Sequence, residues 1–415
     1  MQIIAKPSKH IRQVGLLYVT TIFGVLIGVL NSVINTRSLS PEPYGDVRYV
    51  QNIISFISSL LLFGFFTSGS RLLALSKSEE QSRHIRGIMV VLLSIAVFVV
   101  MVCMTIFYIV SVMKGTENLS SLWLAAIPSC GSALMISYIN TTAQGDNHIG
   151  RISVARLMPS AVYCVLAFFI YRYFGATPVL MLLLHNGIAT IILSLIIWST
   201  HPSLKDLKSS FKELREENRT YGFNIYLGSL VTISTSYIAG ITLGNFCENN
   251  SNVGFYTLAL TISHPLATLP AIVGTTFFKR FAKVNRISRK VLTSSVAISA
   301  LSCILFIAFI HIVVNFLYNE SYSSVSTYAK WLAIGTTLHG FGDMLNRFLG
   351  AHGQGRQIRN GAFASGITKT IGSFLFVYLW SINGAVFNSI LGSVIYFSSM
   401  LFYYIKFVKS TNPEA

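Results

Sequence analysis

The stretch HGFGDMLNRFLGAHGQGRQIRNGAFASGITK (residues 339–369) decides the fold, because it predicts two hydrophobic helices joined by a short, basic, glycine-rich loop. His339, Asp343 and Arg347 recur at intervals of four residues, so they share one face of the first helix. Lys369 lies near the middle of the second helix. If both helices span a bilayer, these charges lie where water is scarce. Such residues normally face a bundle interior or a water-filled cavity.

The composition favours a membrane protein. Hydrophobic residues make up 53% of the 415 residues and charged residues only 11%, with a mean hydropathy of +0.62. A soluble domain carries about 25% charged residues. The sequence therefore predicts an all-α, polytopic membrane protein embedded in a lipid bilayer.

The apolar runs are long enough to cross a bilayer core of about 30 Å, and we count about twelve of them. The first run, 14–35, is too long for a signal-peptide core and lacks an A-x-A cleavage site, so we expect an uncleaved first span. The predicted spans are 14–35, 47–69, 87–113, 121–143, 153–174, 178–199, 221–246, 254–278, 291–317, 325–349, 360–381 and 384–408.

The distribution of basic residues predicts the orientation. With the N-terminus inside, 25 of the 31 Lys and Arg residues fall on inner segments, and five fall on outer ones. The positive-inside rule then places both termini in the cytoplasm. This bias also explains the net charge of +17, so no nucleic-acid partner is predicted.

Weak self-similarity predicts two halves. Ala143-x-Gly145 and Arg151 recur as Ala351-x-Gly353 and Arg359, each displaced by about half the chain length. Because six helices are an even number, the two halves would run in the same direction, as in parallel repeats. We therefore predict an N-terminal six-helix bundle (1–200), a polar cytoplasmic linker (201–220) and a C-terminal six-helix bundle (221–415).

Polar residues of the first two spans are candidates for a cavity lining. Asn31 and Asn35 form an amide pair four residues apart, Arg37 follows them, and Arg48 and Gln51 begin the second helix. A structural alternative applies to the two arginines, whose long side chains can extend to the outer interface without any binding role. The sequence leaves both interpretations open.

The charged stretch also has two interpretations. Asp343 can simply neutralise Arg347 on the same helix face, or the pair, with His339, can act as a proton- or ion-sensitive latch, since a partly desolvated carboxylate has a movable pKa. Lys369 differs because no acidic residue lies within two turns on its own helix. We therefore expect Lys369 to face a cavity.

The motifs of soluble enzymes are missing from the sequence. It contains no H-E-x-x-H, no G-x-S-x-G and no Walker loop, and its five cysteines lack metal-ligand spacing. We therefore predict a transporter rather than an enzyme, with no cofactor and no bound metal. Without a nucleotide-binding domain, energy would come from an ion gradient or from the substrate.

Four segments in order carry a resemblance to a family: RSLSPEPYGDVRYVQ (37–51), GFFTSGSRLLALS (64–76), NVGFYTLALTIS (252–263) and SINGAVFNSILGSVIYF (381–397). The chain resembles the polysaccharide and O-antigen flippases of the multidrug/oligosaccharidyl-lipid/polysaccharide exporter superfamily over essentially its whole length. The resemblance implies two bundles around a V-shaped central cavity that opens alternately to each side. One departure is Ala239, which stands about where many relatives carry an acid, so a coupling role for that acid cannot be carried over.

The resemblance also implies the substrate. It is an undecaprenyl-diphosphate-linked oligosaccharide, such as an O-antigen repeat unit, moved from the cytoplasmic to the periplasmic leaflet of the bacterial inner membrane. Lys369 would pair with the diphosphate, helped by Arg37 or Arg48. Asn31, Asn35 and Gln51 would bind sugar, together with seventh-helix side chains (Thr232, Ser234, Thr235, Ser236 and Tyr237). A proton or sodium gradient and the polysaccharide polymerase are the other candidate partners.

Two rival functions remain open from the sequence. A cation-coupled multidrug antiporter of the same superfamily would need acidic residues for cationic drugs, whereas the mid-span charge here is Lys369. A membrane glycosyltransferase or ligase would need a large periplasmic loop with catalytic side chains. The longest predicted outer connection has only about a dozen residues, which disfavours that enzyme class.

Overall fold

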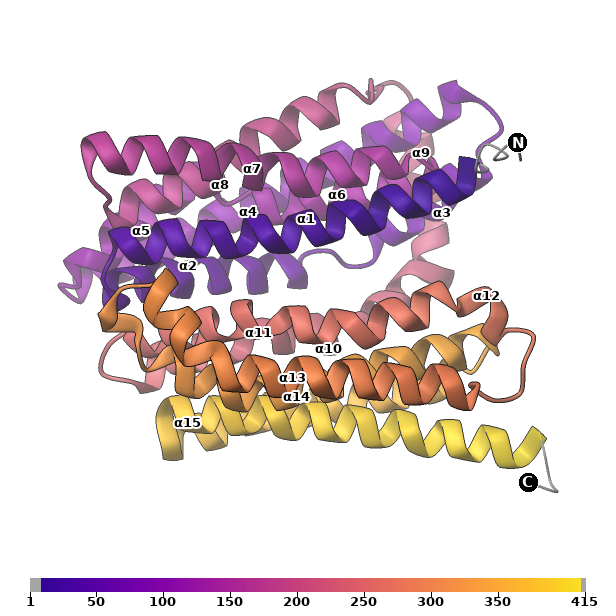
Figure 1. Cartoon of the computed structure of the whole chain (residues 1–415). Coiled ribbons are helices and arrows are strands. Elements are labelled where there is room, and N and C mark those ends of the chain that lie inside the picture. The colour runs from indigo at the N-terminus through magenta and orange to yellow at the C-terminus, as the bar shows by residue number, and fades with distance from the viewer. Residues whose placement is uncertain (1–8, 412–415) are drawn as a thin grey trace, which may run out of the picture. The chain divides into compact units, whose positions relative to one another are not determined.

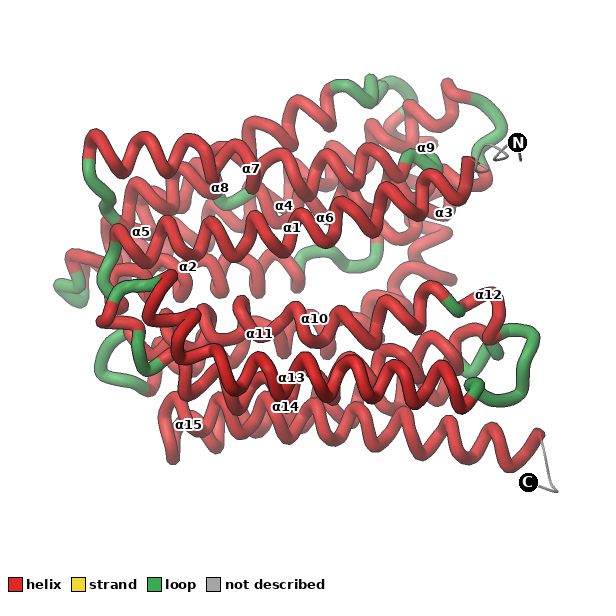
Figure 2. The backbone as a smooth tube through the Cα atoms, in the orientation of Figure 1, coloured by secondary structure: helices red, strands yellow, loops and turns green. Residues whose placement is uncertain are grey.

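The computed structural model describes residues 9–411, except for the side chains of residues 9–19, 149, 224, 228, 231–234 and 279. All regular secondary structure in this range is helical, as Figure 2 shows. The chain divides into two compact units. Unit 1 contains the described residues up to Leu39 together with Ile53–Leu230, and unit 2 contains Ser40–Asn52 together with the described residues from Val231 onward.

Unit 1 is built from helices that are labelled in Figure 1. Its helices are α1 (Lys9–Ser38), the end of α2 (Pro41–Leu60), α3 (Phe65–Leu75), α4 (Glu79–Met113), α5 (Glu117–Ala126), α6 (Ser132–Gly145), α7 (Ile149–Phe174), α8 (Pro178–Trp198), α9 (Leu207–Glu217) and the start of α10 (Phe223–Phe246). Helix α1 packs against α7, and α3 packs against α6. A 3₁₀ turn (Ile127–Ser129) joins α5 to α6.

The predicted linker, 201–220, is largely helical in the structure. A π-helical turn (Asn218–Gly222) joins α9 to α10. Asn218 donates from Nδ2 to the carbonyl of Phe63 (3.1 Å) and accepts from Ser68 Oγ (3.0 Å). The end of this segment is therefore fixed to the bend between α2 and α3, where Gly64 adopts a positive φ of 81°.

Unit 2 contains the start of α2, the end of α10, and five further helices: α11 (Ser251–Thr276), α12 (Phe278–Phe281), α13 (Arg289–Leu317), α14 (Val325–Ala351) and α15 (Gly355–Thr411). A 3₁₀ turn (Glu320–Tyr322) precedes α14. Helix α14 packs against both α11 and α15. A Cβ atom at Gly340 would lie 2.3 Å from the carbonyl oxygen of Ala267. Only glycine permits this approach, which seats the charged face of α14 beside α11.

Helix α15 is interrupted by a sharp bend. Trp380 and Ser381 leave helical geometry, and Ser381 has a positive φ of 48°. The bend folds the second half of α15 back along the first, so Asn388 reaches the carbonyl of Lys369 (2.8 Å). This break falls where the sequence predicted one span to end and the next to begin.

The chain is a multi-pass membrane protein. Seven helices of the described residues are long and apolar enough to cross a membrane, or eight if the bent pair α2 and α3 forms one span. Helices α1, α10 and α14 match predicted spans but are not among the seven. In α14 the charged and polar face lowers the hydropathy. The total of twelve spans, the division at 200 and 221, and the cytoplasmic termini stay predictions.

Candidate functional site

A polar cavity of about 230 Å³ lies inside unit 2, among α10, α11, α14 and α15. It is lined by hydroxyl, amide, imidazole and amine groups interspersed with small apolar side chains. The polar lining consists of Thr235, Ser236, Tyr256, His264, Thr336, His339, Lys369, Ser373, Asn388, Ser389 and Ser393. This lining places many polar groups around the cavity, which favours a hydrated polar ligand over a hydrophobic one.

Lys369 enters this cavity from the first half of α15. Its side chain runs across Gly392, where a Cβ atom would lie 2.4 Å from Lys369 Cγ and 2.5 Å from Cε. Gly392 therefore leaves the space that the lysine chain occupies. Among the described residues, no carboxylate forms an ion pair with the Lys369 amine. The prediction that Lys369 faces a cavity is consistent with this geometry, whereas its role stays a prediction.

The backbone around Lys369 is held by an amide across the bend of α15. Asn388 donates from Nδ2 to the carbonyl of Lys369 and to Ser373 Oγ (3.0 Å), while its own Oδ1 is buried without a described partner. Ser365 Oγ donates to the carbonyl of Gly392 (2.8 Å). These bonds fix the two halves of α15 against each other and so fix the root of the lysine side chain.

Helix α14 supplies the histidine and the carboxylate. The ring of His339 stacks on Tyr396 with 4.6 Å between centroids, and its Nδ1 is buried without a described partner. The Tyr396 hydroxyl donates to Asp343 Oδ1 (3.0 Å) and accepts from Asn346 Nδ2 (2.8 Å). Tyr396 therefore joins His339 and Asp343 into one polar cluster.

The cluster is electrostatically coupled to the cavity. Asp343 acts through space on Lys369, and Lys369 acts on His339, although neither pair is in direct ionic contact. His264 from α11 acts on both His339 and Asp343. A change of charge on Asp343 therefore acts on Lys369, and a change on His264 acts on His339 and Asp343.

The direct ion pair between Asp343 and Arg347, one of the two alternatives from the sequence, is not among the described contacts. The described ion pairs do not include it, and the carboxylate bonds to Tyr396 instead. Arg347 is exposed, and its Cβ and Cγ lie beside Gly274 of α11. The spacing of four residues allowed the contact, but Tyr396 on another helix half offered a closer donor.

Arg48 and Gln51 bond to each other at the start of α2, outside this cavity. Arg48 Nη1 donates to Gln51 Oε1 (3.0 Å), and the guanidinium lies over the ring of Tyr44, 4.9 Å from its centroid. Arg48 Nε is buried without a described partner. The Tyr44 ring also meets Tyr322 edge-on. The Arg48 guanidinium therefore packs against aromatic side chains of unit 2.

Asn31 and Asn35 lie in unit 1 and face α7. Asn31 Nδ2 donates to the carbonyl of Ser160 (3.2 Å), and Asn35 Oδ1 accepts from the hydroxyl of Tyr163. Both amides are buried, so they support the packing of α1 on α7. Arg37 at the end of α1 is exposed.

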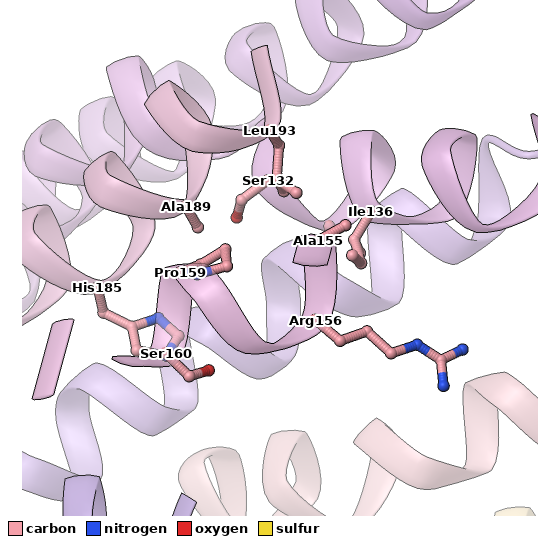
Figure 3. Close-up of a pocket in the computed structure, with 10 residues that line it drawn as sticks. Ser132, Ile136, Ala155, Arg156, Pro159, Ser160, His185, Ala189 and Leu193 are labelled. Carbon is pink, nitrogen blue, oxygen red and sulfur yellow. The ribbon is translucent and has the colours of Figure 1, made fainter. Parts of the chain in front are cut away.

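A second cavity, of about 270 Å³, lies in unit 1 among α6, α7 and α8. Figure 3 shows Pro159 and Ser160 of α7 near His185 of α8, while Arg156 extends away from them. His185 meets the ring of Tyr163 edge-on, so this cavity adjoins the hydrogen bond that holds Asn35.

Only some of the predicted sugar-binding side chains of the seventh helix, which is α10, are found at the Lys369 cavity. Thr235 and Ser236 line the Lys369 cavity, and Tyr237 is not among its lining residues. The side chains of Thr232 and Ser234 lie outside the described residues.

Sequence reasoning missed most of the polar lining, including two residues of the cavity and one of the adjoining cluster that take part in the contacts described above. His264, Asn388 and Tyr396 come from α11 and from the second half of α15. A lone histidine before Pro265, and an amide inside an apolar span, were available signals. Tyr396 carried no such signal. Among the residues that the structure describes, no group of three or more His, Cys, Asp and Glu side chains is placed to hold a metal ion.

A family model identifies the family of the chain, and solved structures share its fold. The family model described as "Polysaccharide biosynthesis protein" matches residues 11–285. No curated protein sequence matches the chain at a significant level.

Solved structures of similar fold include three transporters. The lipid II flippase MurJ in an inward-closed conformation is 13% identical, with a TM-score of 0.72, over 95% of this chain and 89% of that one. An inward-facing multidrug resistance MATE family transporter of the MOP superfamily is 14% identical, with a TM-score of 0.70, over 94% and 96%. A MOP superfamily transporter from Pyrococcus furiosus is 15% identical, with a TM-score of 0.59, over 95% and 96%.

Proposed function

Because the chain belongs to the polysaccharide biosynthesis protein family, we propose that it is a flippase for a lipid-linked oligosaccharide. The substrate is an undecaprenyl-diphosphate carrying an O-antigen repeat unit or a similar surface-polysaccharide unit. It moves from the cytoplasmic to the periplasmic leaflet of the inner membrane by alternating access. The protein acts as a transporter and forms no covalent intermediate with the sugar.

The observation that carries this proposal is the Lys369 amine in a polar cavity, where no described carboxylate pairs with it. A buried ammonium ion is expensive unless a partner neutralises it. A diphosphate is a multivalent anion that cannot cross hydrocarbon unaided, whereas its polyprenyl tail prefers lipid. A ligand of this charge would supply an ionic partner that none of the described carboxylates supplies by direct contact.

The surrounding groups have distinct proposed roles. Lys369 is a mobile point charge for the diphosphate. Arg37 and Arg48 are proposed to assist it, and Gln51 is proposed to bind sugar. Asn31 and Asn35 are assigned to sugar as well, although their buried contacts with α7 imply that they act mainly by positioning that helix.

Gating is assigned to the cluster beside the cavity. Asp343 and His339 both contact Tyr396, and the charge of Asp343 acts through space on Lys369. Loss or gain of a proton or sodium ion in this cluster would change the charge that the substrate meets. We therefore propose that an ion gradient couples to transport here, with Arg347 acting through space on Asp343. The polysaccharide polymerase is the proposed recipient of the flipped product.

The second candidate is a cation-coupled multidrug antiporter, because a multidrug resistance transporter shares this fold. That function needs a site for cationic drugs. The cavity of unit 2 contains an amine in its wall, and an amine repels a cationic drug. The charge of the cavity therefore favours the flippase.

Deletion of the gene separates the two functions. For a flippase, the deletion strain accumulates the lipid-linked oligosaccharide on the cytoplasmic side and loses surface polysaccharide, and the wild-type gene restores both. For an antiporter, the surface polysaccharide is unchanged and the strain becomes sensitive to cationic drugs. Drug sensitivity with normal surface polysaccharide would overturn the proposal.

The proposed topology has its own test. Reporter tags in the 201–220 segment and at the C-terminus should both report cytoplasm, since basic residues are concentrated on that side. A periplasmic signal from either tag would overturn the proposed orientation.

A further inference from the structure

One end of unit 2 is covered with exposed cations. This end consists of α12, the loop between α12 and α13, the loop between α14 and α15, and the last turns of α15. We call it the cationic end. Its exposed basic side chains are Arg280, Lys283, Arg286, Arg289, Lys290, Arg356, Arg359, Lys406 and Lys409.

No acidic residue lies within four positions of any of these cations in the sequence. The segments 277–290, 344–361 and 397–411 contain no Asp or Glu at all. All four ion pairs among the described residues lie in unit 1, such as that between Arg71 and Glu217. The segment 201–220 also carries several lysines and arginines, but acids are interspersed among them. The described charged side chains of the cationic end are therefore positive, with no negative charges interspersed among them.

The loop that carries the central cations is held firmly. The backbone N–H of Ile287 donates to the Tyr404 hydroxyl (3.0 Å), and a ring nitrogen of His352 meets the carbonyl of Val284 (3.1 Å). Phe281 and Ile287 are buried in a hydrophobic cluster that includes Phe348. A loop fixed in this way presents its charges at defined positions, which lowers the ordering cost of binding.

The same loop forms a hollow of about 560 Å³. Its lining combines two guanidinium groups, an amide and a hydroxyl, from Arg286, Arg289, Asn285 and Ser288. Arginine forks match phosphate oxygens two at a time, and the amide and hydroxyl can complete the shell. The Ser288 side chain does not cap α13, so its hydroxyl is not used by the helix.

The location of the cationic end indicates which class of anionic ligand it binds. It lies where α11 ends, α13 begins and α15 ends. Helix α13 begins with basic residues and α15 has one in its last turn, so this end lies at the membrane–water interface. Clusters of four to eight Lys and Arg at such a boundary typically bind anionic lipids. The positive-inside rule explains why basic residues gather at this end. It does not explain why the loop that carries them is held in place or why it forms a hollow.

We propose that the cationic end binds anionic phospholipid of the leaflet it faces, with a headgroup phosphate in the hollow between Arg286 and Arg289. This site goes beyond the proposed transport function, because its ligand is a resident membrane lipid and is not carried across. Bound lipid would hold the α12–α13 loop, and with it the end of α14 through His352.

Thermal unfolding of the purified full chain in neutral detergent tests the proposal, with dioleoyl phosphatidylglycerol as the probe and dioleoyl phosphatidylcholine as the neutral lipid. Phosphatidylglycerol should raise the Tm, and phosphatidylcholine should raise it far less. The Arg286→Gln/Arg289→Gln variant should need about tenfold more phosphatidylglycerol for the same shift, since two charge contacts are lost. Both side chains are exposed, so the variant should fold.

Matched variants complete the test. Lys208→Gln/Arg215→Gln removes two exposed charges from α9 and should respond like the wild type. Arg286→Lys/Arg289→Lys keeps the charge and should need only a few-fold more lipid. An unchanged response of the Gln variant, or an equal response to both lipids, would overturn the proposal. Inorganic phosphate at millimolar concentration giving the full Tm shift would overturn it too, because the ligand would then be a free anion.

Discussion

Arg86 in unit 1 and Lys369 in unit 2 are both cations inside helical bundles, but their surroundings differ completely. Arg86 is 6% exposed and donates to Glu79 (2.8 Å), to both oxygens of Asp146 (3.1 and 3.2 Å) and to the carbonyl of Thr200 (3.0 Å). Lys369 enters a polar cavity, and no described carboxylate pairs with its amine.

This difference in surroundings indicates a structural role for Arg86 and a candidate binding role for Lys369. The guanidinium of Arg86 is satisfied by the protein, so it joins α4 to the end of α6 and to the end of α8. Removing it would leave Asp146 buried and poorly paired. Removing the Lys369 amine leaves no carboxylate without its direct partner, and it relieves an electrostatic penalty.

The largest expected effect is on stability, from Arg86→Met. Breaking a buried pair from one side is expected to lower the free energy of unfolding by about 3–5 kcal/mol. Membrane levels of the protein should fall strongly, and transport should fall in proportion. Blotting of membrane fractions, together with thermal unfolding in detergent, measures the loss.

Arg83→Met is the matched control for Arg86. Arg83 lies on the same helix, is exposed, and donates only to the carbonyl of His201 (2.9 Å). Its replacement should leave membrane levels close to wild type. If membrane levels fell equally in the two variants, the burial and ion pairs of Arg86 would not make it more important for stability than Arg83.

An intermediate effect, on transport alone, is expected from Asp343→Asn. The amide keeps an acceptor for the Tyr396 hydroxyl, so packing is conserved while the negative charge is lost. We expect export to fall about tenfold, or about 1.4 kcal/mol, with an altered pH dependence and normal membrane levels. Normal export across a pH series would restrict Asp343 to a structural role.

The smallest effect is expected from Arg151→Met. Arg151 also pairs with Asp146 (3.2 Å), but its side chain is 22% exposed, and Arg86 still satisfies the carboxylate. Partly exposed pairs contribute about 0–1 kcal/mol, so the free energy of unfolding should change by less than about 1 kcal/mol. A loss as large as that of Arg86→Met would mean that the network depends on both arginines equally.

The sequence predicted those features that depend on local pattern. Apolar run length indicated the membrane helices, and the break before Gly384 coincides with the bend in α15. The interval between His339 and Asp343 placed them on one face, and both join the cluster beside the Lys369 cavity. Lys369 itself was marked by the absence of an acid on its own helix.

Contacts between distant segments were not predictable in the same way. Tyr396 is 53 residues from Asp343, and nothing in the intervening sequence favours it over Arg347 as a partner. Asn31 and Asn35 were expected to line a cavity, but α7 offers Ser160 and Tyr163 as bonding partners. Arg86 was counted only as one of the inner basic residues, because Asp146 lies 60 residues away.

Replacement of Lys369 tests the central claim most directly. Export of surface polysaccharide is measured in a flippase-deletion strain complemented with Lys369→Ala, Lys369→Arg or Lys369→Glu, with membrane levels checked by blot. If Lys369 binds the diphosphate, the Ala and Glu variants reach normal levels but do not restore export, and the Arg variant restores part of it because charge is kept. Full restoration by Lys369→Ala at wild-type levels would contradict the account and remove Lys369 from the substrate path.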